Sequence, residues 1–500
     1  MQSYDVIIIG AGVVGNAIAR ELSKHKLKIA VLDKEADVGF GTSSRNSGVL
    51  HSGVNYKPGT LRAILSVKGN AMMDSLCADL KVKIKRIGKL TVALDEEELP
   101  DIERLMNQGM ANNVPGLVFM NNEEMQKIQP GVQGIKGLWS PTSAIISPYG
   151  LTIALAENAH ANGVEFHLNT EVVAVNKKED GTFVVEDKNG QQFVCKMLIN
   201  AAGLYAGVIS EMLGVCTSNN NDSVTIYPCR GEYYVLDKRL DGSLKTLLYP
   251  APSPKHAGLG IHLTPTVDGN ILIGPSAQYI STDTPEDYAS TSSIMADLRK
   301  EGEELLHGIQ MSDFIRNFAG CRAKRTPPSV GGNADFIIEE SKQVSGFVNI
   351  VGIESPGLTS APAIAEMVVG FVGEHMPLQL KDNFIAERQG IAGHFSDLSF
   401  EEQQKLVQEY PEYGEIVCRC EKITKKEIRD AIENPLGAKT LIGIKYRARN
   451  GMGRCQAGFC MPKVIQILRD EYGYDIKDYT LNKADKSLFA QAVREGDCKC

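Results

Sequence analysis

The chain has few of the features that mark membrane, secreted or nucleic-acid-binding proteins. Its longest apolar stretch, residues 6–19, contains three glycines and is too short to cross a bilayer as a helix. No basic and apolar leader precedes it, so we expect neither a secretory signal nor a transmembrane segment. The 61 acidic residues outnumber the 53 Lys and Arg, and the net charge of −8 argues against nucleic acid as a partner. We expect a cytoplasmic protein, and peripheral association with the cytoplasmic face of a membrane stays open.

Cysteine, in contrast, is abundant and unevenly placed. A chain of 500 residues predicts about three domains and a large core. Eleven cysteines are present, and six of them lie in the last 83 residues. In a protein that we expect to be cytoplasmic, this asymmetry indicates a metal or redox module rather than a disulfide scaffold.

A dinucleotide-binding pattern opens the sequence. Residues 4–9 read as a strand, and Gly10-Ala11-Gly12-Val13-Val14-Gly15 then leads into a helix. Asp33 ends the next strand, 18 residues after Gly15. The glycines allow a tight turn and close approach of a pyrophosphate to the helix N-terminus, and the acid can bind a ribose hydroxyl.

Two further segments favour FAD over NAD. The buried strand at 197–200 ends in Ala201-Ala202-Gly203, where small residues let another backbone come close. Residues 352–359 form a loop ahead of a helix predicted at about 361–373, and such a helix start beside a flavin ring would stabilise its reduced anion. Three contact segments spread along the chain suit a large cofactor.

These segments resemble the D-amino-acid oxidase superfamily of flavoproteins over about residues 4–375. Within it the chain is similar to the glycerol-3-phosphate oxidase and L-2-hydroxyglutarate oxidase types, and the most specific part is Asn46-Ser47-Gly48-Val49-Leu50-His51-Ser52-Gly53. The resemblance also includes the segments at 57–59, 268–275, 318–322 and 355–359. It implies an α/β fold in which a Rossmann-like FAD-binding domain carries an inserted α+β substrate domain. The expected FAD-binding residues are Gly10, Gly12, Gly15, Asp33, Ser47, Gly48, Ala202, Gly203, Gly357, Leu358 and Thr359.

The cysteines near the C-terminus form two close pairs. Cys418-Arg419-Cys420 is followed after 34 residues by Cys455 and Cys460, which can together supply four thiolates. A [2Fe–2S] cluster needs such a set, and Arg447, Arg449 and Arg454 are expected to offset its negative charge. A structural zinc site is the alternative, although C-x-C with C-x4-C is unusual for zinc ribbons.

The C-terminal region resembles the bacterioferritin-associated-ferredoxin type of [2Fe–2S] domain. It is also similar to the C-terminus of the anaerobic glycerol-3-phosphate dehydrogenase large subunit. Residues 415–470 carry 12 Lys and Arg against 6 Asp and Glu, so the region is basic within an acidic chain. The remaining Cys498 and Cys500 are expected to be frayed, non-ligating thiols.

Three residues are the candidate catalytic set. His51 is the expected base, since imidazole can accept a proton near neutral pH. Arg322 is the expected clamp for a phosphate or carboxylate, and Ser355 is expected to touch substrate or flavin. Lys324 and Arg325 can equally face solvent, and His262 is either a substrate contact or a packed strand residue. Leu259 stands where the oxidase type has a lysine, which weakens the case for phosphate or for oxygen as acceptor.

The expected function follows from these parts. We expect an FAD-dependent dehydrogenase that oxidises sn-glycerol 3-phosphate to dihydroxyacetone phosphate and passes electrons through the cluster to a second flavoprotein or another electron-accepting subunit of a heteromeric complex. An L-2-hydroxyglutarate dehydrogenase is the alternative, an amino or imino acid is a third substrate class, and a non-catalytic electron-transfer or cluster-sensing protein is an alternative of another kind. The expected domains are 1–82, 141–223 and 315–375 for FAD, 83–140 and 224–314 for substrate, a linker at 376–412, the cluster domain at 413–475 and a tail at 476–500.

Overall fold

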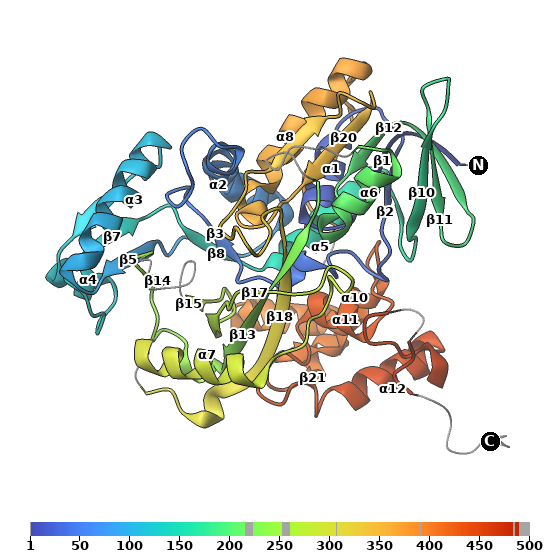
Figure 1. Cartoon of the computed structure of the whole chain (residues 1–500). Helices are drawn as coiled ribbons and strands as arrows, with labels where there is room; N and C mark the ends of the chain where they lie inside the picture. Colours follow the sequence, from blue (N-terminus) through green and yellow to red (C-terminus); the bar gives the residue numbers. More distant parts are fainter. Residues whose placement is uncertain are drawn as a thin grey trace.

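The computed structural model describes residues 2–215, 224–252, 261–306, 308–389, 393–483 and 486–489. Two large sheets and a small C-terminal helical module make up this part of the chain (Figure 1). The tail cysteines and Leu259 lie outside the described residues.

The first sheet has eight strands and contains the N-terminal strand that the sequence predicts. Its order is β10-β11-β12-β1-β2-β9, with β20 paired to β12 and β19 paired to β20. β1 runs parallel to both β2 and β12, as in a dinucleotide-binding fold. The bounds are β1 (Gln2–Ile9), β2 (Ile29–Leu32), β9 (Glu165–His167), β10 (Val172–Lys177), β11 (Phe183–Asp187), β12 (Gln192–Asn200), β19 (Ile337–Glu340) and β20 (Phe347–Val351).

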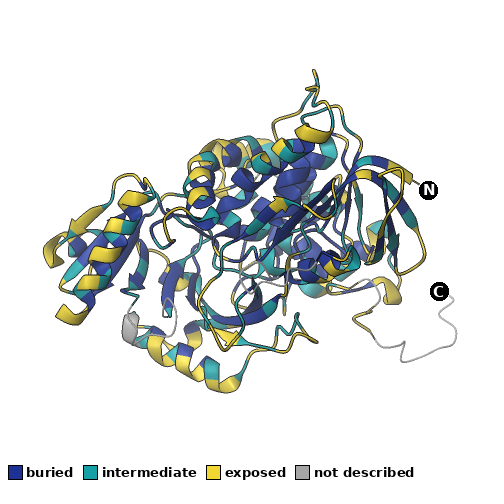
Figure 2. Cartoon of the chain, turned by 45° about the horizontal axis from the view of Figure 1, so that its top comes forward, coloured by how far each residue is buried: buried dark blue, intermediate teal, exposed yellow. Residues whose placement is uncertain are grey.

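Helices cover one face of this sheet and enclose the largest hydrophobic core. Side chains of β1 and β2, such as Ile8 and Val31, pack there against α1, α2, α5 and α8. The other face packs against Ile209 of α6 and the hairpin strands β10 and β11. The central strands β2 and β20 are buried, whereas β10 at the edge is partly exposed (Figure 2). The bounds are α1 (Val13–Leu22), α2 (Leu61–Leu80), α5 (Pro148–Ala161), α6 (Ala206–Met212) and α8 (Gly357–His375).

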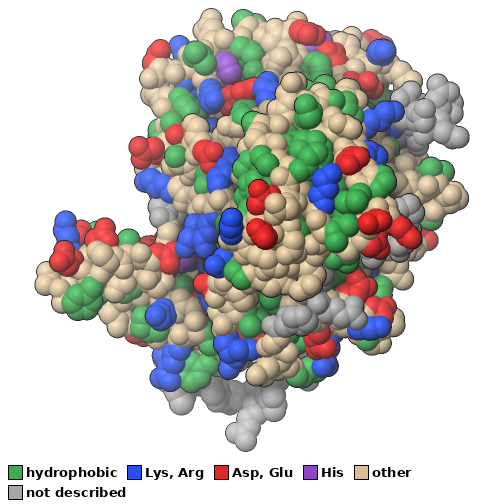
Figure 3. All heavy atoms as spheres, turned by 90° about the vertical axis from the view of Figure 1, so that its left-hand side faces the viewer, with side chains coloured by type: hydrophobic (Ala, Val, Ile, Leu, Met, Phe, Trp, Pro, Cys, Tyr) green, Lys and Arg blue, Asp and Glu red, His purple; other side chains and the backbone are tan. Residues whose placement is uncertain are grey.

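The second sheet has nine strands and carries a projecting arm formed around α3 and α4 (Figure 1). Its order is β17-β13-β16-β15-β14-β5-β7-β6, with β18 paired along β13. Acidic and basic side chains alternate on the face that includes the arm, without a large area of one sign (Figure 3). The bounds are β5 (Lys89–Ala93), β6 (Val118–Met120), β7 (Lys136–Ser140), β13 (Tyr227–Leu236), β14 (Leu247–Pro250), β15 (His262–Pro265), β16 (Ile271–Gly274), β17 (Gln278–Tyr279), β18 (Phe314–Lys324), α3 (Leu99–Ala111), α4 (Asn122–Ile128) and α7 (Ser292–Leu305).

A three-stranded sheet, in the order β3-β8-β4, lies between these parts. Its strands are β3 (Val49–Leu50), β4 (Ile84–Lys85) and β8 (Ala144–Ile146). β18 belongs to the second sheet, so the domain boundary expected at 314 falls at the start of a strand of that sheet. β18 then continues to Lys324, ten residues beyond that boundary, before the chain returns to β19 and β20 of the first sheet.

The C-terminal module has its own small core. Apolar residues of three helices and one hairpin, including Ile428, Ile444 and Val464, form it. The segment at 376–412, expected as a linker, contains α9, and the capping box that the sequence predicts from Ser399 to Glu402 is present there. The bounds are α9 (Phe400–Glu409), β21 (Ile416–Cys418), β22 (Ile423–Thr424), α10 (Lys425–Glu433), α11 (Leu441–Ala448) and α12 (Met461–Tyr472). Among the described residues no helix combines the length and apolarity needed to cross a membrane.

Candidate functional site

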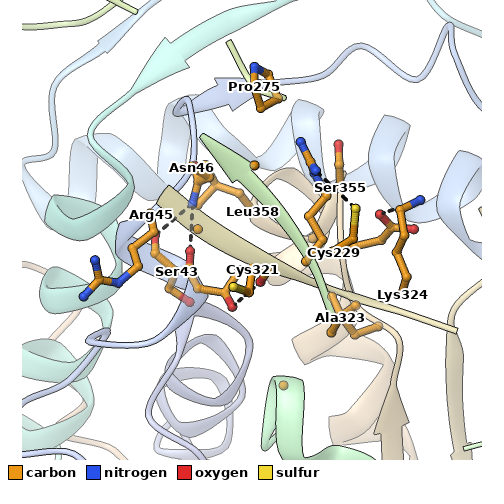
Figure 4. Close-up of a pocket in the computed structure, with 18 of the residues that line it drawn as sticks. Ser43, Arg45, Asn46, Cys229, Pro275, Cys321, Ala323, Lys324, Ser355 and Leu358 are labelled. Carbon is orange, nitrogen blue, oxygen red and sulfur yellow. Dashed lines mark hydrogen bonds and ion pairs between the residues drawn. The ribbon is translucent and has the colours of Figure 1, made fainter. Parts of the chain in front are cut away.

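A cavity of about 990 Å³ lies where the two large sheets meet. Residues of the loops after β1, β2 and β12 line it from the first sheet, and β13, β14 and β18 line it from the second. Close to the loop at 43–46, the paired strands β13 and β18 bring Cys229, Cys321, Ala323 and Lys324 to its wall (Figure 4).

The glycines of the first motif hold one end of this cavity together. Gly10 has φ +110°, and a Cβ there would lie 2.4 Å from the carbonyl oxygen of Ala201. A Cβ on Gly15 would lie 1.9 Å from the carbonyl oxygen of Gly10. Neither collision can be relieved by a side-chain movement, because both involve backbone atoms. β1, α1 and the segment after β12 can therefore pack this closely only with glycine at both positions.

Asp33 is fixed at the same end. Its carboxylate accepts hydrogen bonds from the backbone N–H of Ala11 at 2.6 Å and of Glu35 at 2.8 Å. Burial raises the pKa of Asp33 to about 6. The residue lines the cavity, where the sequence predicts a ribose contact.

The other expected cofactor residues fall into two sets. Gly15, Gly48 and Thr359 do not line the cavity, and Thr359 supports it from behind because its Oγ1 accepts a hydrogen bond from His51 N–H at 2.9 Å. The expected residues that line it are Gly10, Gly12, Asp33, Ser47, Ala202, Gly203, Gly357 and Leu358.

The donors around this cavity fit FAD. The N-termini of α1 and α8 suit a phosphate and the flavin pyrimidine ring, because neither N-cap residue, Gly12 or Pro356, caps its helix with a side chain. The first N–H of each helix is already donated, that of Val13 to Ser43 Oγ at 2.9 Å and that of Gly357 to the Glu354 carbonyl oxygen at 2.6 Å. α8 begins at Gly357, four residues before the predicted start, which brings its N-terminus to the wall of the cavity.

His51 and Ser355 meet in the same cavity. His51 Nε2 lies 3.2 Å from Ser355 Oγ, which lies 3.3 Å from the Tyr56 hydroxyl. Burial, and then the positive charges of Lys89, His262 and Arg62, lower the pKa of His51 to about 3. The imidazole is therefore neutral at physiological pH and has a lone pair that can accept a proton.

Arg322 projects from β18 into the cavity wall. It donates a hydrogen bond to the carbonyl oxygen of Ser276 at 3.0 Å and contacts Cys229 Sγ at 3.7 Å. A Cβ on Gly231 would lie 2.8 Å from Arg322 Nη2, so a glycine there leaves room for the guanidinium. Its remaining donors are suited to an anionic substrate group.

The structure shows which of the other three candidate residues line the cavity. Lys324 lines the cavity and donates to Gly332 O at 2.7 Å and Asn333 Oδ1 at 2.6 Å. Arg325 does not line the cavity, is buried, and donates to the carbonyl oxygen of Asp335 at 2.8 Å. His262 lines the cavity and stacks on Tyr249, with ring centroids 4.0 Å apart.

The sequence reasoning missed several residues of this site. Tyr56, Arg62 and Tyr249 line the cavity, and Lys89 lies beside it. Arg62 pairs with Glu354 at 3.2 Å and donates to the Ser355 carbonyl oxygen. Lys89 offered one signal in the sequence, because it stands in an otherwise apolar strand segment, where a lysine is unusual.

The four module cysteines form two pairs. The thiol of Cys460 hydrogen-bonds to Cys418, which lowers the pKa of Cys418 to about 6, and Cys420 likewise contacts Cys455. The first pair is buried and the second is exposed. Among the described residues, no three His, Cys, Asp or Glu side chains are grouped closely enough to hold a single ion. Two cysteine pairs instead suit a cluster with two irons.

The three arginines expected beside the cluster also connect the module to the rest of the chain. Arg447 is buried and binds Asp37 with two hydrogen bonds of 2.5 and 2.9 Å. Arg449 pairs with Asp268 and with Glu421, and Arg454 pairs with Asp237 at 2.7 Å. The aspartates belong to the flavin and substrate parts of the chain. Lys445, a residue the sequence reasoning missed, interacts electrostatically with Cys460, and burial lowers the pKa of Lys445 to about 7.

Aromatic side chains connect the cavity to the docked module. Phe40 lines the cavity and contacts Tyr446 of α11 edge to face, with ring centroids 5.8 Å apart. Tyr446 stacks on Tyr149 at 5.0 Å, and the Tyr149 hydroxyl reaches Met452 Sδ at 3.4 Å. Met452 is three residues from Cys455, so continuous side-chain contact runs from the cavity to the cysteine segment.

The fold, the glycine-lined cavity and the paired cysteines define a flavin-dependent oxidoreductase with an attached iron–sulfur module. The model of the FAD dependent oxidoreductase family matches residues 5–370, and the BFD-like [2Fe-2S] binding domain matches residues 416–470. The chain belongs to the FAD dependent oxidoreductase family, and the predictions of FAD, of the fold class and of the C-terminal domain are confirmed.

Relatives and solved structures agree with this assignment. The chain is 41% identical to a glycerol 3-phosphate dehydrogenase of Caloramator mitchellensis, with 95% of this chain and 96% of the relative covered. It is 30% identical to the human mitochondrial L-2-hydroxyglutarate dehydrogenase, covering 75% and 90%. The structure of FAD-bound L-alpha-glycerophosphate oxidase from Mycoplasma pneumoniae superposes with a TM-score of 0.70 at 30% identity, covering 77% and 98%.

Proposed function

We propose that this chain is an FAD-dependent dehydrogenase that converts sn-glycerol 3-phosphate to dihydroxyacetone phosphate. The observation that carries the proposal is the meeting of His51, Ser355 and Arg322 in the cavity that the FAD motif also lines. The full-length similarity to a glycerol 3-phosphate dehydrogenase, which extends through the cysteine module, supports the choice of substrate.

The residues divide the chemistry among them. Arg322 holds the anionic end of the substrate. His51 accepts the proton of the secondary hydroxyl at Nε2, the ring nitrogen that faces the cavity beside Ser355 Oγ. When bound, FAD supplies the acceptor for the hydride, so the alcohol loses two electrons and two protons and becomes a ketone. Bound substrate also displaces water from the buried side of the cavity, which strengthens each of these contacts.

The module supports an electron exit to a partner. When bound, a [2Fe–2S] cluster accepts one electron at a time. Tyr446 and Phe40 keep the module in contact with the flavin cavity, and the exposed Cys420 and Cys455 face the solvent that a partner can reach. A second flavoprotein or another electron-accepting subunit is the proposed recipient.

Anaerobic mixing of the holoenzyme with substrate tests the proposal. Glycerol 3-phosphate is expected to bleach the flavin and to produce the EPR signal of a reduced [2Fe–2S] cluster. If only L-2-hydroxyglutarate bleaches the flavin, the chain is instead an L-2-hydroxyglutarate dehydrogenase, the activity named for relatives that are 30% identical. Failure with all polar alcohols and amines tested would support a non-catalytic protein, and zinc in place of iron would remove the electron exit.

A further inference from the structure

Lys89 is buried beside the cavity on the second sheet. Its side chain comes from β5, next to β14, and only 2% of the residue is exposed. Lys89 Nζ donates a hydrogen bond to Asn55 Oδ1 at 2.5 Å and lies 5.2 Å from the ring centroid of Tyr249. Asn55 and Tyr249 both line the cavity, so the ammonium group lies directly behind its wall.

The charge of Lys89 is not neutralised within the described part of the chain. Buried Arg62 pairs with Glu354, Arg230 with Asp287 and Arg447 with Asp37, whereas no described carboxylate forms an ion pair with Lys89. Burial alone lowers its pKa, to about 7. A buried ammonium without a counter-ion is costly, and an arriving anion would remove that cost.

A second polar group on the same strand also lacks a partner. Thr91 follows Lys89 by two residues on β5, so both side chains point to the same face of the sheet. Thr91 Oγ1 is buried and forms no hydrogen bond. The strand β5 therefore carries a charged donor and a hydroxyl whose polar demands the described protein groups do not meet, and such groups call for an explanation such as a ligand.

We propose that Lys89, with Asn55 and Tyr249, forms an anion-binding subsite of the cavity that takes the phosphate group of the substrate. The inference rests on the proposed function, because that function supplies a phosphate monoester. From behind Asn55, Lys89 adds its positive charge to the attraction that Arg322 exerts on the anionic substrate.

The subsite also links substrate binding to the base. The positive charge of Lys89 is one of the causes that lower the pKa of His51. An anion on Lys89 offsets this charge, so the pKa of His51 rises when substrate is bound. His51 is then a stronger proton acceptor in the complex than in the free enzyme.

Anaerobic titration of the oxidised holoenzyme with inorganic phosphate tests the subsite, read out by the flavin absorbance and by calorimetry. Lys89→Met is expected to weaken phosphate binding about tenfold or more. Lys245→Met removes an exposed lysine just before β14 and is the matched control, with unchanged phosphate binding expected. Equal phosphate affinity of Lys89→Met and wild type would overturn the subsite.

A second variant keeps the test valid if Lys89→Met does not fold. Asn55→Asp leaves Lys89 in place and gives it a carboxylate partner, which competes with phosphate, so weaker binding is again expected. Unchanged phosphate affinity in Asn55→Asp would contradict the subsite.

Tighter binding of glutarate than of phosphate by the wild type would overturn the choice of phosphate. If the wild type binds phosphate through Lys89 but glycerol 3-phosphate does not bleach its flavin, the proposed function fails and the subsite stands.

Discussion

His51 lines the substrate cavity beside a pair of hydroxyl groups, those of Ser355 and Tyr56. Replacing it with Asn keeps a polar side chain of similar size but removes the proton acceptor. We expect His51→Asn to lower the rate of flavin bleaching by substrate about 10²–10⁴-fold, the range typical of general base catalysis. Stopped-flow absorbance under anaerobic conditions measures this rate. The variant should retain FAD and phosphate affinity, and wild-type bleaching by His51→Asn would exclude His51 as the base.

The lowered pKa of Lys89 predicts how activity depends on pH. An anion binds the protonated amine, and burial depresses the pKa of Lys89 to about 7, so kcat/KM should decline as the pH rises through about 7. His51, with a pKa of about 3, and Tyr249, whose pKa burial raises, keep their protonation states across this range. Steady-state assays with an artificial electron acceptor give the profile. Lys89→Arg should move the decline to higher pH, and an unchanged profile would contradict the assignment.

Single residues differ in how far the sequence reveals them. His51, Arg322 and Ser355 stand in segments whose resemblance to known flavoproteins is specific, and the structure brings all three to one cavity. Their catalytic roles stay predictions. Lys89 could not be assigned, because the meaning of a strand lysine depends on Asn55 and Tyr249, which come from other parts of the chain.

At the scale of elements, the turn between β1 and α1 tolerates little change at Gly10. Gly10 combines φ +110° with a collision of any Cβ against Ala201 O. We therefore expect Gly10→Ala to displace β1 from β12 and to abolish stable FAD binding, seen as a lower ratio of flavin to protein after purification. Gly190→Ala is the control, since Gly190 has φ +79° but open space around it. Full flavin content in Gly10→Ala would contradict this prediction.

The elements themselves were largely predictable. Capping boxes, recognisable in the sequence as Ser or Thr followed by Glu three residues later, are present at Ser399 and Thr424. Local patterns sufficed there because side chain and backbone partner lie within three residues of each other. The start of α8 was predicted four residues too late, because Gly357 and Leu358 are poor local signals for a helix and begin α8 within a packed environment.

At the scale of the whole molecule, the position of the module depends on a buried ion pair. The Arg447 side chain is fully buried against Asp37, and removing one partner of such a pair costs about 3–5 kcal/mol. We expect Arg447→Met to leave flavin bleaching by substrate intact but to slow reduction of the cluster, measured by rapid-freeze EPR. Proteolysis within 376–412 should also become faster.

A surface arginine provides the comparison. Arg469 of α12 pairs with Asp470, and both side chains are largely exposed, so Arg469→Met should change neither cluster reduction nor proteolysis. Equal behaviour of the two variants would show that the Arg447–Asp37 pair does not hold the module.

The docking itself was not predictable from the sequence. Arg447, Arg449 and Arg454 were expected beside the cluster because they lie near its cysteines in sequence. Their partners Asp37, Asp268 and Asp237 are some 180 to 410 residues away, and no local pattern connects such positions. Only the folded chain shows that these charges join the parts of the molecule.

The unequal burial of the two cysteine pairs has a consequence for handling the protein. Cys418 and Cys460 are shielded, while Cys420 and Cys455 are open to dissolved oxidants. Oxygen is therefore expected to reach the module first at Cys420 and Cys455, with loss of iron, while the flavin stays bound in its cavity. Protein purified in air is therefore expected to retain its flavin and its reduction by substrate, but to lose electron transfer to an external acceptor.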